Sequence, residues 1–303
     1  MATISAIVLA PDPRHAREAV ASVATQQGQD VELVVVVPGA AALDADPELA
    51  AKAHVVRLPA DSSPAAVRNA GIQVARGQYF CVVEPPDVLL GKDVLARHVA
   101  ALEADATAVA SYGRSEVADN GATRVRPERG RGGWILRRLV QHKGLIASSA
   151  SVVWRRSMLR AAPFDESYRT PAGLLLALLV NASKDHPFLF LPDAVARTNK
   201  RANVDPGGAS EPPKTEALAV TEEQVKVFVA LLYGATRLEE RLEARVRFRL
   251  ARHLVALGKH HYRKGDHARA GRLFGEAVKA VPSYFKGRRY QFMNFFKGVI
   301  SRP

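Results

Sequence analysis

The C-terminal segment 283–303 has the residue types and spacing whose chemistry is clearest in this chain. Aromatic and basic side chains are interleaved in this segment. Together they suit an anionic membrane surface, where the aromatic rings enter the headgroup layer and the basic groups contact lipid phosphates. The same residue types can stack nucleic-acid bases and bind their phosphates, or can form a terminal helix packed within the protein. We rank the membrane surface first, the packed helix second and nucleic acid third, because no nucleic-acid motif is present. The aromatic members are Tyr284, Phe285, Tyr290, Phe292, Phe295 and Phe296, and the basic members are Lys286, Arg288, Arg289 and Lys297.

The formal net charge of +13 is unevenly distributed along the chain. Residues 1–100 contain 8 lysines and arginines against 11 acids, whereas the remaining residues contain 35 against 19. A basic surface of this kind attracts phosphates, anionic lipid or nucleic acid without specifying which of them it meets. Simple solubility of an arginine-rich protein explains the charge equally well.

The single cysteine, Cys81, lies in an apolar run, so it cannot form an internal disulfide. No basic residue adjoins it to lower the pKa of the thiol, and we therefore expect a small core residue and not a nucleophile. A dinucleotide-binding dehydrogenase is excluded, because no G-x-G-x-x-G loop follows the first apolar run. That position reads Ala10-Pro11-Asp12-Pro13.

The composition, 48% hydrophobic and 24% charged, is that of a globular protein with one main domain and an appendage. No stretch approaches eighteen consecutive apolar residues, and Met1 precedes Ala2, Thr3 and Ile4 instead of a basic segment and an apolar signal region. We expect a cytosolic protein, with segment 283–303 as the part that could attach it peripherally to the inner face of the membrane.

Short β-branched apolar runs alternate with segments of helical spacing over the first hundred residues. Alternating elements of these lengths predict an α/β fold with a mostly parallel, doubly wound sheet and helices on both of its faces. The ligand crevice of such a sheet opens at the C-terminal strand ends, here the loops after Leu9, Val37, Leu58 and Val83. The expected strands are Ile4–Leu9, Val31–Val37, His54–Leu58 and Gln78–Val83, and the expected helices are Pro13–Gln27 and Ala65–Ala75.

The next hundred residues complete the sheet with less regular elements. Segment 120–133 is polar and rich in arginine and glycine, without an apolar period, and we expect it to be a mobile loop. The sheet is expected to end near Arg197. The expected strands are Ala108–Tyr112, Ser151–Trp154 and Phe188–Leu191, and the expected helices are Asp93–Glu103, Trp134–Gln141 and Arg156–Ala161.

Composition changes sharply after residue 200. Residues 201–216 include Pro206, Gly207, Gly208, Pro212 and Pro213, which suits a linker between a domain at 1–200 and a helical region at 217–303. Thr221, with Gln224 three residues later, has the spacing of a capping box and predicts the start of a helix.

The helical region contains one motif of known spacing. Its positions resemble one tetratricopeptide repeat, with Leu254 where tryptophan is usual. One repeat cannot bury its own apolar face, so it must stack on the preceding helices, expected at 222–232 and 236–253, or on a partner protein. The motif positions are Leu257, Gly258, His261, Gly265, Ala270, Phe274, Ala277 and Pro282.

Several short sequence motifs within residues 4–200 resemble those of one enzyme family and occur in the same order along the chain. The most specific piece is Ala66-Val67-Arg68-Asn69-Ala70-Gly71 followed by Ala75-Arg76-Gly77-Gln78-Tyr79, which is similar to "AARNxGxxxARGEY" at the same spacing. Other pieces are similar to "EAIxSVLxQ" at 18–26, "ELIVV" at 32–36, and "FDEsl" at 164–168. On these pieces the chain resembles the bacterial family 2 glycosyltransferases of the GT-A fold.

The resemblance implies a Rossmann-like GT-A domain that moves a sugar from a sugar nucleotide to a hydroxyl of a glycan or lipid-linked acceptor, usually with inversion. In this family an aspartate after the second strand recognises the nucleobase. A DXD-type motif after the fourth strand holds Mn²⁺ or Mg²⁺, which neutralises the departing diphosphate. A further acid deprotonates the acceptor.

This chain departs from the family at all three acidic features. The segment after the second strand reads Val37-Pro38-Gly39-Ala40-Ala41, with no carboxylate for the base. The DXD-type position reads Glu84-Pro85-Pro86-Asp87, which keeps oxygen ligands at both ends and loses the central aspartate. The helix that should open with an acidic pair reads Thr170-Pro171-Ala172-Gly173-Leu174-Leu175.

By the resemblance, Arg68, Asn69, Glu84 and Asp87 are the candidates to bind the nucleotide or its diphosphate, and Glu84 and Asp87 are also the candidate metal ligands. Structural capping is the alternative for Arg68 and Asn69, and a rigid proline turn with solvated carboxylates is the alternative for the two acids. Asp165 and Glu166 are nearby acids and candidates for a general base, although in the family they belong to a structural turn.

Two functional hypotheses follow. The first is a degenerate GT-A domain, a pseudoenzyme that binds a glycan, a nucleotide or a partner transferase, with the helical region as adaptor. The second is a divergent, active sugar-nucleotide-dependent transferase that uses Glu84 and Asp87 with a metal ion. The three acidic features are lost while the sequence motifs of the strands and helices are kept, and this favours the degenerate, non-catalytic domain.

Overall fold

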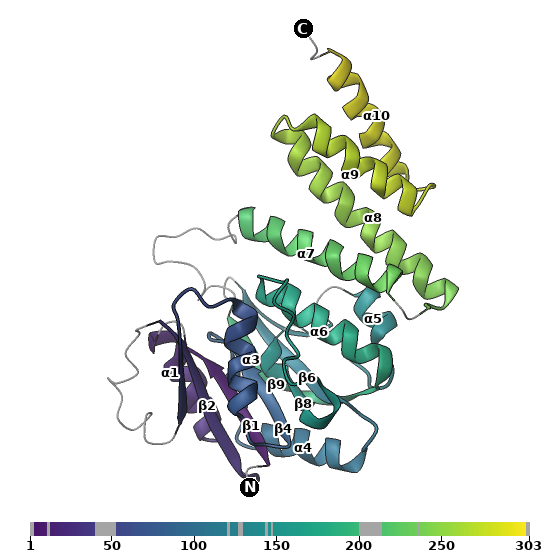
Figure 1. Cartoon of the computed structure of the whole chain (residues 1–303). Coiled ribbons are helices and arrows are strands. Elements are labelled where there is room, and N and C mark those ends of the chain that lie inside the picture. The colour runs from purple at the N-terminus through teal and green to yellow at the C-terminus, as the bar shows by residue number, and fades with distance from the viewer. Residues whose placement is uncertain are drawn as a thin grey trace. The chain divides into compact units, whose positions relative to one another are not determined.

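The computed structural model describes residues 3–10, 13–39, 53–119, 122–126, 130–142, 145–146, 148–199, 214–234 and 237–300. The chain divides into two compact units, Met1–Ser210 and Glu211–Pro303. The first unit is an α/β sheet structure and the second is helical (Figure 1).

The first half of the sheet is parallel. Its strands are β1 (Ile4–Leu9), β2 (Val31–Pro38), β3 (His54–Leu58) and β4 (Tyr79–Val83), in the order β3-β2-β1-β4. The expected parallel arrangement is therefore confirmed for these four strands. Every residue of β1 and β4 is buried, which is why both read as continuous apolar runs instead of alternating ones.

Helices cover both faces of this parallel half. Even-numbered β1 residues, Ile4 to Val8, share a core with α1 (Pro13–Ala24) and α4 (Val94–Ala104). On the opposite face, α3 (Pro64–Val74) approaches the sheet so closely that a Cβ at Gly71 would lie 2.4 Å from Ile7 Cγ2. Because side chains alternate across a strand, one apolar run supplies both cores. Cys81 is buried in the first of them, as expected, and burial raises the pKa of its thiol to about 12.

The second half of the sheet is mixed, and it is joined to the first by an antiparallel strand. β8 (Val152–Arg155) pairs antiparallel with β4 and with β6 (Ala110–Asp119), and β6 pairs parallel with β9 (Phe188–Asn199). The short β5 (Val88–Leu89) pairs antiparallel with β9. The remaining helices that the structure describes in this unit are α5 (Leu136–Gln141), α6 (Pro171–Asp185) and the single turns η2 (Ser149–Ser151) and η3 (Arg156–Met158).

Two sequence expectations for this half are wrong. Part of the expected loop 120–133 is strand β7 (Ala122–Arg126), which pairs antiparallel with β6; residues 120, 121 and 127–129 lie outside the described part. The side chains of 122–125 are exposed, so backbone pairing forms this strand without any apolar signal. The helix expected over Arg156–Ala161 is only the turn η3, because the backbone becomes extended at Leu159.

The second unit consists of α7 (Lys214–Tyr233), α8 (Glu240–Arg263), α9 (His267–Ala280) and α10 (Phe285–Ile300). The helix start predicted at Thr221 is wrong, because this residue lies inside α7, where its hydroxyl donates to the carbonyl of Ala217 at 2.8 Å. Most of the predicted linker, 201–213, lies outside the described residues.

The predicted repeat positions lie in the α8–α9 hairpin. Gly265, with φ of +80°, forms the turn, and the side chain of Asp266 caps α9 by accepting from the Arg269 N–H at 3.0 Å. Phe274 packs against Gly258, where a Cβ would lie 2.5 Å from the ring. Assignment of this hairpin to the tetratricopeptide class stays a prediction. Among the helices that the structure describes, none is long and apolar enough to cross a bilayer.

Candidate functional site

A cleft of about 510 Å³ lies at the C-terminal ends of the parallel strands, where the strand order predicts a ligand crevice. Its floor is formed by the ends of β1, β2 and β4, and its walls by the first turns of α3 and α6, by η2 and by β9. The lining residues include Leu9, Pro38, Ser62, Pro64, Arg68, Glu84, Asp87, Ser148, Ser149, Pro171, Ala172 and Thr198.

Among the described residues that line the cleft, only Arg68, Glu84 and Asp87 are charged. Arg68 comes from the second turn of α3, which begins with Ser63 as N-cap and Pro64 at the first helical position. Only 3% of Arg68 is exposed, so its charge requires a partner.

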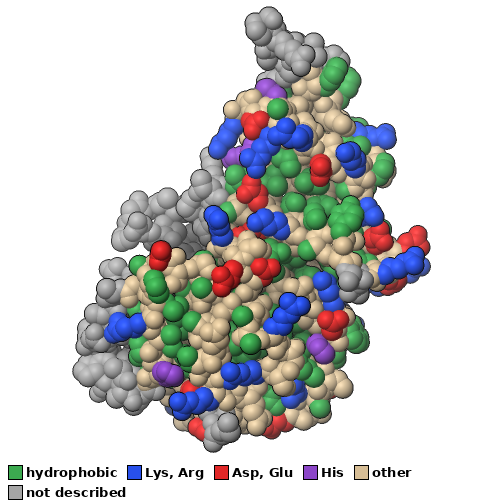
Figure 2. Space-filling model, viewed as in Figure 1, with side chains coloured by type: hydrophobic (Ala, Val, Ile, Leu, Met, Phe, Trp, Pro, Cys, Tyr) green, Lys and Arg blue, Asp and Glu red, His purple; other side chains and the backbone are tan. Residues whose placement is uncertain are grey.

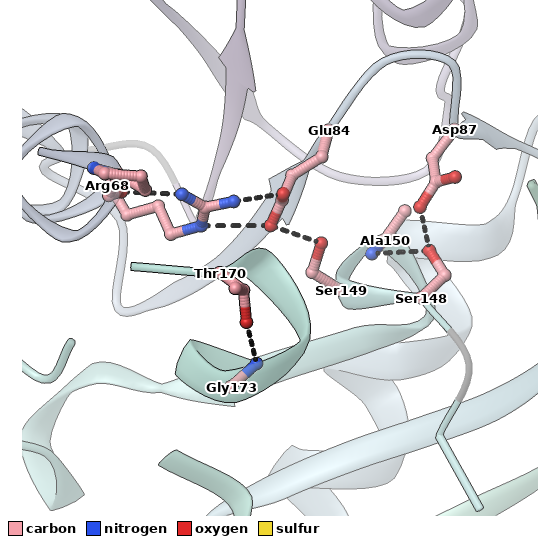
Figure 3. A network of polar contacts seen from close by, with 9 residues as sticks. Arg68, Glu84, Asp87, Ser148, Ser149, Ala150, Thr170 and Gly173 are labelled. Carbon is pink, nitrogen blue, oxygen red and sulfur yellow. Dashed lines mark hydrogen bonds and ion pairs between the residues drawn. The ribbon is translucent and has the colours of Figure 1, made fainter. Parts of the chain in front are cut away.

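That partner is Glu84, which follows directly after β4 (Figure 3). Arg68 Nε donates to Glu84 Oε1 at 3.1 Å, and Arg68 Nη2 donates to Oε2. The third guanidinium nitrogen, Nη1, donates to the carbonyl of Pro64 at 2.6 Å. Ser149 Oγ also donates to Glu84 Oε1, at 3.0 Å. Both oxygens of the carboxylate and all three nitrogens of the guanidinium are therefore engaged.

Asp87 lies at the end of the turn Glu84-Pro85-Pro86-Asp87, whose Pro85-Pro86 bond is cis. Its N–H donates to the carbonyl of Glu84 at 2.9 Å, and its Oδ2 accepts from Ser148 Oγ (Figure 3). Ser148 is held in place because its own Oγ accepts from the Ala150 N–H at 3.0 Å. Burial raises the pKa of Asp87 to about 6, against the lowering effect of hydrogen bonds from Ser148 and Thr198, and the charge of Glu84 raises it further.

Asn69, next to Arg68 in α3, is committed to the fold. Its Nδ2 donates to the carbonyl of Phe164 at 2.8 Å, and its Oδ1 accepts from the Phe164 N–H at 3.0 Å. Two reciprocal hydrogen bonds use the amide in both directions, so the side chain ties α3 to the segment after η3. Asn69 does not line the cleft.

The two candidate bases also lie outside the cleft lining. Asp165 and Glu166 are exposed, and Asp165 Oδ1 accepts from the Ser167 N–H at 2.8 Å in a local turn. The structure therefore brings together Arg68, Glu84 and Asp87 of the predicted site residues, but not Asn69, Asp165 or Glu166.

The carboxylates of the cleft do not fit a divalent metal as they are arranged. Mg²⁺ and Mn²⁺ need several oxygen ligands that are free to turn toward the ion, whereas Glu84 accepts three hydrogen bonds and Asp87 is held by Ser148. Within the described ranges, no three His, Cys, Asp or Glu side chains are grouped so that they could hold a metal ion.

Sequence reasoning missed the polar residues of the cleft that come from the second half of the sheet, Ser148, Ser149 and Thr198. A signal was present, since Ser148-Ser149-Ala150 immediately precedes the strand expected at Ser151–Trp154. Because β8 runs antiparallel to β4, its first residues lie beside the last residues of β4. Predicting the direction of that one strand would have placed the serines at the cleft.

A second cavity, of about 670 Å³, lies at the opposite end of β4 and is lined in part by Arg155 and Arg156. Arg155 donates to the carbonyls of Ala108 and Asp105, at 3.1 and 3.0 Å, and to the hydroxyl of Tyr79 at 3.2 Å. Arg156 donates to the carbonyl of Ala75. Both side chains join elements of the fold, so this cavity is a weaker candidate for a ligand site.

Comparison with known proteins shows what this chain resembles. Residues 14–162 match the model of glycosyl transferase family 2. The whole chain is similar in structure to S. aureus TarS 1–349, with a TM-score of 0.69 and 14% identity over 97% of this chain and 89% of that one. The complex of TarS 1–349 with UDP-GlcNAc gives a TM-score of 0.69 at 16% identity, over the same shares of the two chains. A comparison with curated protein sequences gives no match.

At these identities the structural similarity establishes the fold and not the activity. The predicted GT-A fold is confirmed, and the similarity extends over the helical region as well as the sheet.

Proposed function

Because residues 14–162 match the model of glycosyl transferase family 2, we propose that the cleft binds the diphosphate of a sugar nucleotide without a divalent metal ion and without transferring the sugar. One observation carries the proposal: both carboxylates of the cleft already have hydrogen-bonding partners, Glu84 in Arg68 and Ser149 and Asp87 in Ser148. Glu84 is not free to hold a metal ion or to deprotonate an acceptor, and Asp87 alone supplies too few oxygen ligands for a divalent ion.

Two helix N-termini supply the attraction for the diphosphate in this proposal. Pro64 at the start of α3 and Pro171 and Ala172 at the start of α6 all line the cleft. A helix N-terminus carries a partial positive charge and backbone N–H groups that suit phosphate oxygens. TarS 1–349, which has the same fold, was crystallised with UDP-GlcNAc, and this supports a sugar nucleotide as the ligand class.

Thermal unfolding tests this proposal most directly. UDP-GlcNAc, UDP and other sugar nucleotides are added one at a time, once with EDTA and once with Mn²⁺ or Mg²⁺. A ligand at a hundred times its Kd stabilises the native state by about 2.7 kcal/mol. We expect the same increase of Tm with and without metal, and no release of sugar over extended incubation.

An Ala172→Asp variant shows whether binding occurs in the cleft. Ala172 is exposed in the first turn of α6, where an aspartate favours the helix but repels a diphosphate. We expect this variant to fold and to lose the ligand-induced increase of Tm. Ala161→Asp, also at an exposed alanine but in the second cavity, is the matched control and should keep it. Binding that requires metal, or an unchanged response of Ala172→Asp, would contradict the proposal.

A second function, an active transferase, is favoured by one feature. Asp87 is a buried carboxyl whose pKa of about 6 suits proton transfer near neutral pH. In that case sugar is released from a sugar nucleotide, and Asp87→Asn abolishes the release while the ligand still binds. That result would replace the non-catalytic proposal.

A further inference from the structure

Helix α10 packs on the rest of the helical unit through a face that contains Gly287, Tyr290 and Asn294. A Cβ at Gly287 would lie 3.3 Å from Val278 of α9. Tyr290 stacks on Phe274 with ring centroids 5.5 Å apart. Asn294 Nδ2 donates to the carbonyl of His267 at 3.0 Å. Positions 287, 290 and 294 are one helical turn apart, so they form a single stripe that faces α8 and α9.

The opposite side of α10 is aromatic and exposed. Phe285, Phe292 and Phe295 are 73%, 65% and 66% exposed. Their spacing of seven and three residues places them on one stripe, away from the stripe that packs. An ordinary amphipathic helix of a globular protein turns its apolar stripe toward the core, and α10 does the reverse over the part whose side chains are described.

Basic residues occupy the same exposed side. Arg288 and Arg289 lie on either side of Phe285 and Phe292 on the helical wheel, and both are exposed. Segment 283–303 has five lysines and arginines and no acid, and the unit 211–303 has 19 against nine acids, a net charge of +10 out of +13 for the chain. Basic and hydrophobic side chains are intermixed on the visible surface of this unit (Figure 2).

We propose that the Phe285–Phe292–Phe295 face of α10 docks on an anionic lipid surface. Exposed rings adjacent to arginines match a bilayer interface, in which the rings enter the acyl boundary and the long basic side chains reach the phosphates above it. Segment 283–303 has no acid that could pair with the basic residues of a protein partner, so a protein surface of mixed charge fits this face less well than an anionic lipid surface does. This inference does not depend on the function of the cleft.

Vesicle sedimentation with the full chain tests the inference. Vesicles of phosphatidylcholine alone are compared with vesicles that also contain phosphatidylglycerol. We expect binding to the anionic vesicles only. Phe285→Ser with Phe292→Ser should lower the partition coefficient on the order of a hundredfold, and Arg288→Gln with Arg289→Gln should lower it about thirtyfold. Trp134→Ser, at an equally exposed aromatic residue outside α10, is the matched control and should bind as the unchanged chain does.

A fluorescent variant checks insertion without removing any apolar group. Phe292→Trp should show a blue shift of its emission maximum with anionic vesicles and none with phosphatidylcholine vesicles. Failure of the unchanged chain to sediment with anionic vesicles would overturn the inference. A dimer in solution that the double serine variant dissociates would overturn it too, because a second copy would then cover the face.

Discussion

The titration of Asp87 gives the sharpest test of how the cleft is built. Burial raises the pKa of its carboxyl from 3.8 to about 6, so between these values the native state binds more protons than the unfolded chain. The contribution of Asp87 to the free energy of unfolding is then highest below about pH 4 and decreases as the pH rises through 6. A shift of about two pH units corresponds to about 3 kcal/mol lost by neutral pH.

Asp87→Asn removes this dependence and keeps an oxygen that can accept from Ser148. We expect the variant to be about 2 to 3 kcal/mol more stable than the unchanged chain at pH 7, and nearly equal to it at pH 4. Asp193→Asn, at an acid whose side chain is 66% exposed, is the control and should change stability little at either pH.

Urea unfolding followed by tryptophan fluorescence is the suitable assay. Both tryptophans, Trp134 and Trp154, lie in the sheet unit, so the signal reports on the unit that contains Asp87. Other groups titrate in the same range, and subtracting the curve of the variant from that of the unchanged chain isolates Asp87. Two curves that run parallel from pH 4 to pH 7 would refute the claim that this carboxyl is desolvated.

Two further predictions concern packing and charge. Arg68→Met leaves the carboxylate of Glu84, 20% exposed, without its cation, and should lower the free energy of unfolding by about 3 kcal/mol. The control Arg76→Met, at a side chain that is 75% exposed, should lower it by under about 0.5 kcal/mol. Equal effects of the two variants in urea unfolding would argue against a buried ion pair. Gly258→Ala places a Cβ against the buried ring of Phe274 and should destabilise the helical unit. The control Gly275→Ala, whose Cβ meets nothing closer than 3.8 Å, should stabilise this unit by up to about 1 kcal/mol. Unfolding is followed by the helical circular dichroism signal, and a stabilising effect of Gly258→Ala would contradict the packing of α8 on α9.

The parallel half of the sheet could be predicted because its strands are buried on both faces. Runs such as Ile4–Leu9 and Tyr79–Val83 are apolar throughout, and turn-forming residues separate them from the helices. The cleft could be predicted for the same reason, since parallel strands end together at one edge. The pair of Glu84 with Arg68 was not predicted, although both residues were candidates, because a charge pattern does not specify which of two charged groups is buried.

The mixed half of the sheet escaped sequence reasoning for a different reason. Strand β7 has exposed side chains at 122–125 and is held by backbone pairing with β6, and neither property leaves an apolar period. Ser148 and Ser149 reach the cleft only because β8 runs against β4. Strand direction is decided by long-range packing, which local propensity does not contain.

The cleft is assembled from segments that leave the ribosome at different times. Glu84 lies 16 residues from Arg68 and 65 from Ser149, whereas Asp87 lies 61 residues from Ser148. At roughly 5 to 20 residues per second, those later serines follow roughly 3 to 13 seconds after the acids. During synthesis Glu84 can therefore pair with Arg68 at once, while Asp87 acquires its hydrogen-bond donor only when the second half of the sheet joins the first.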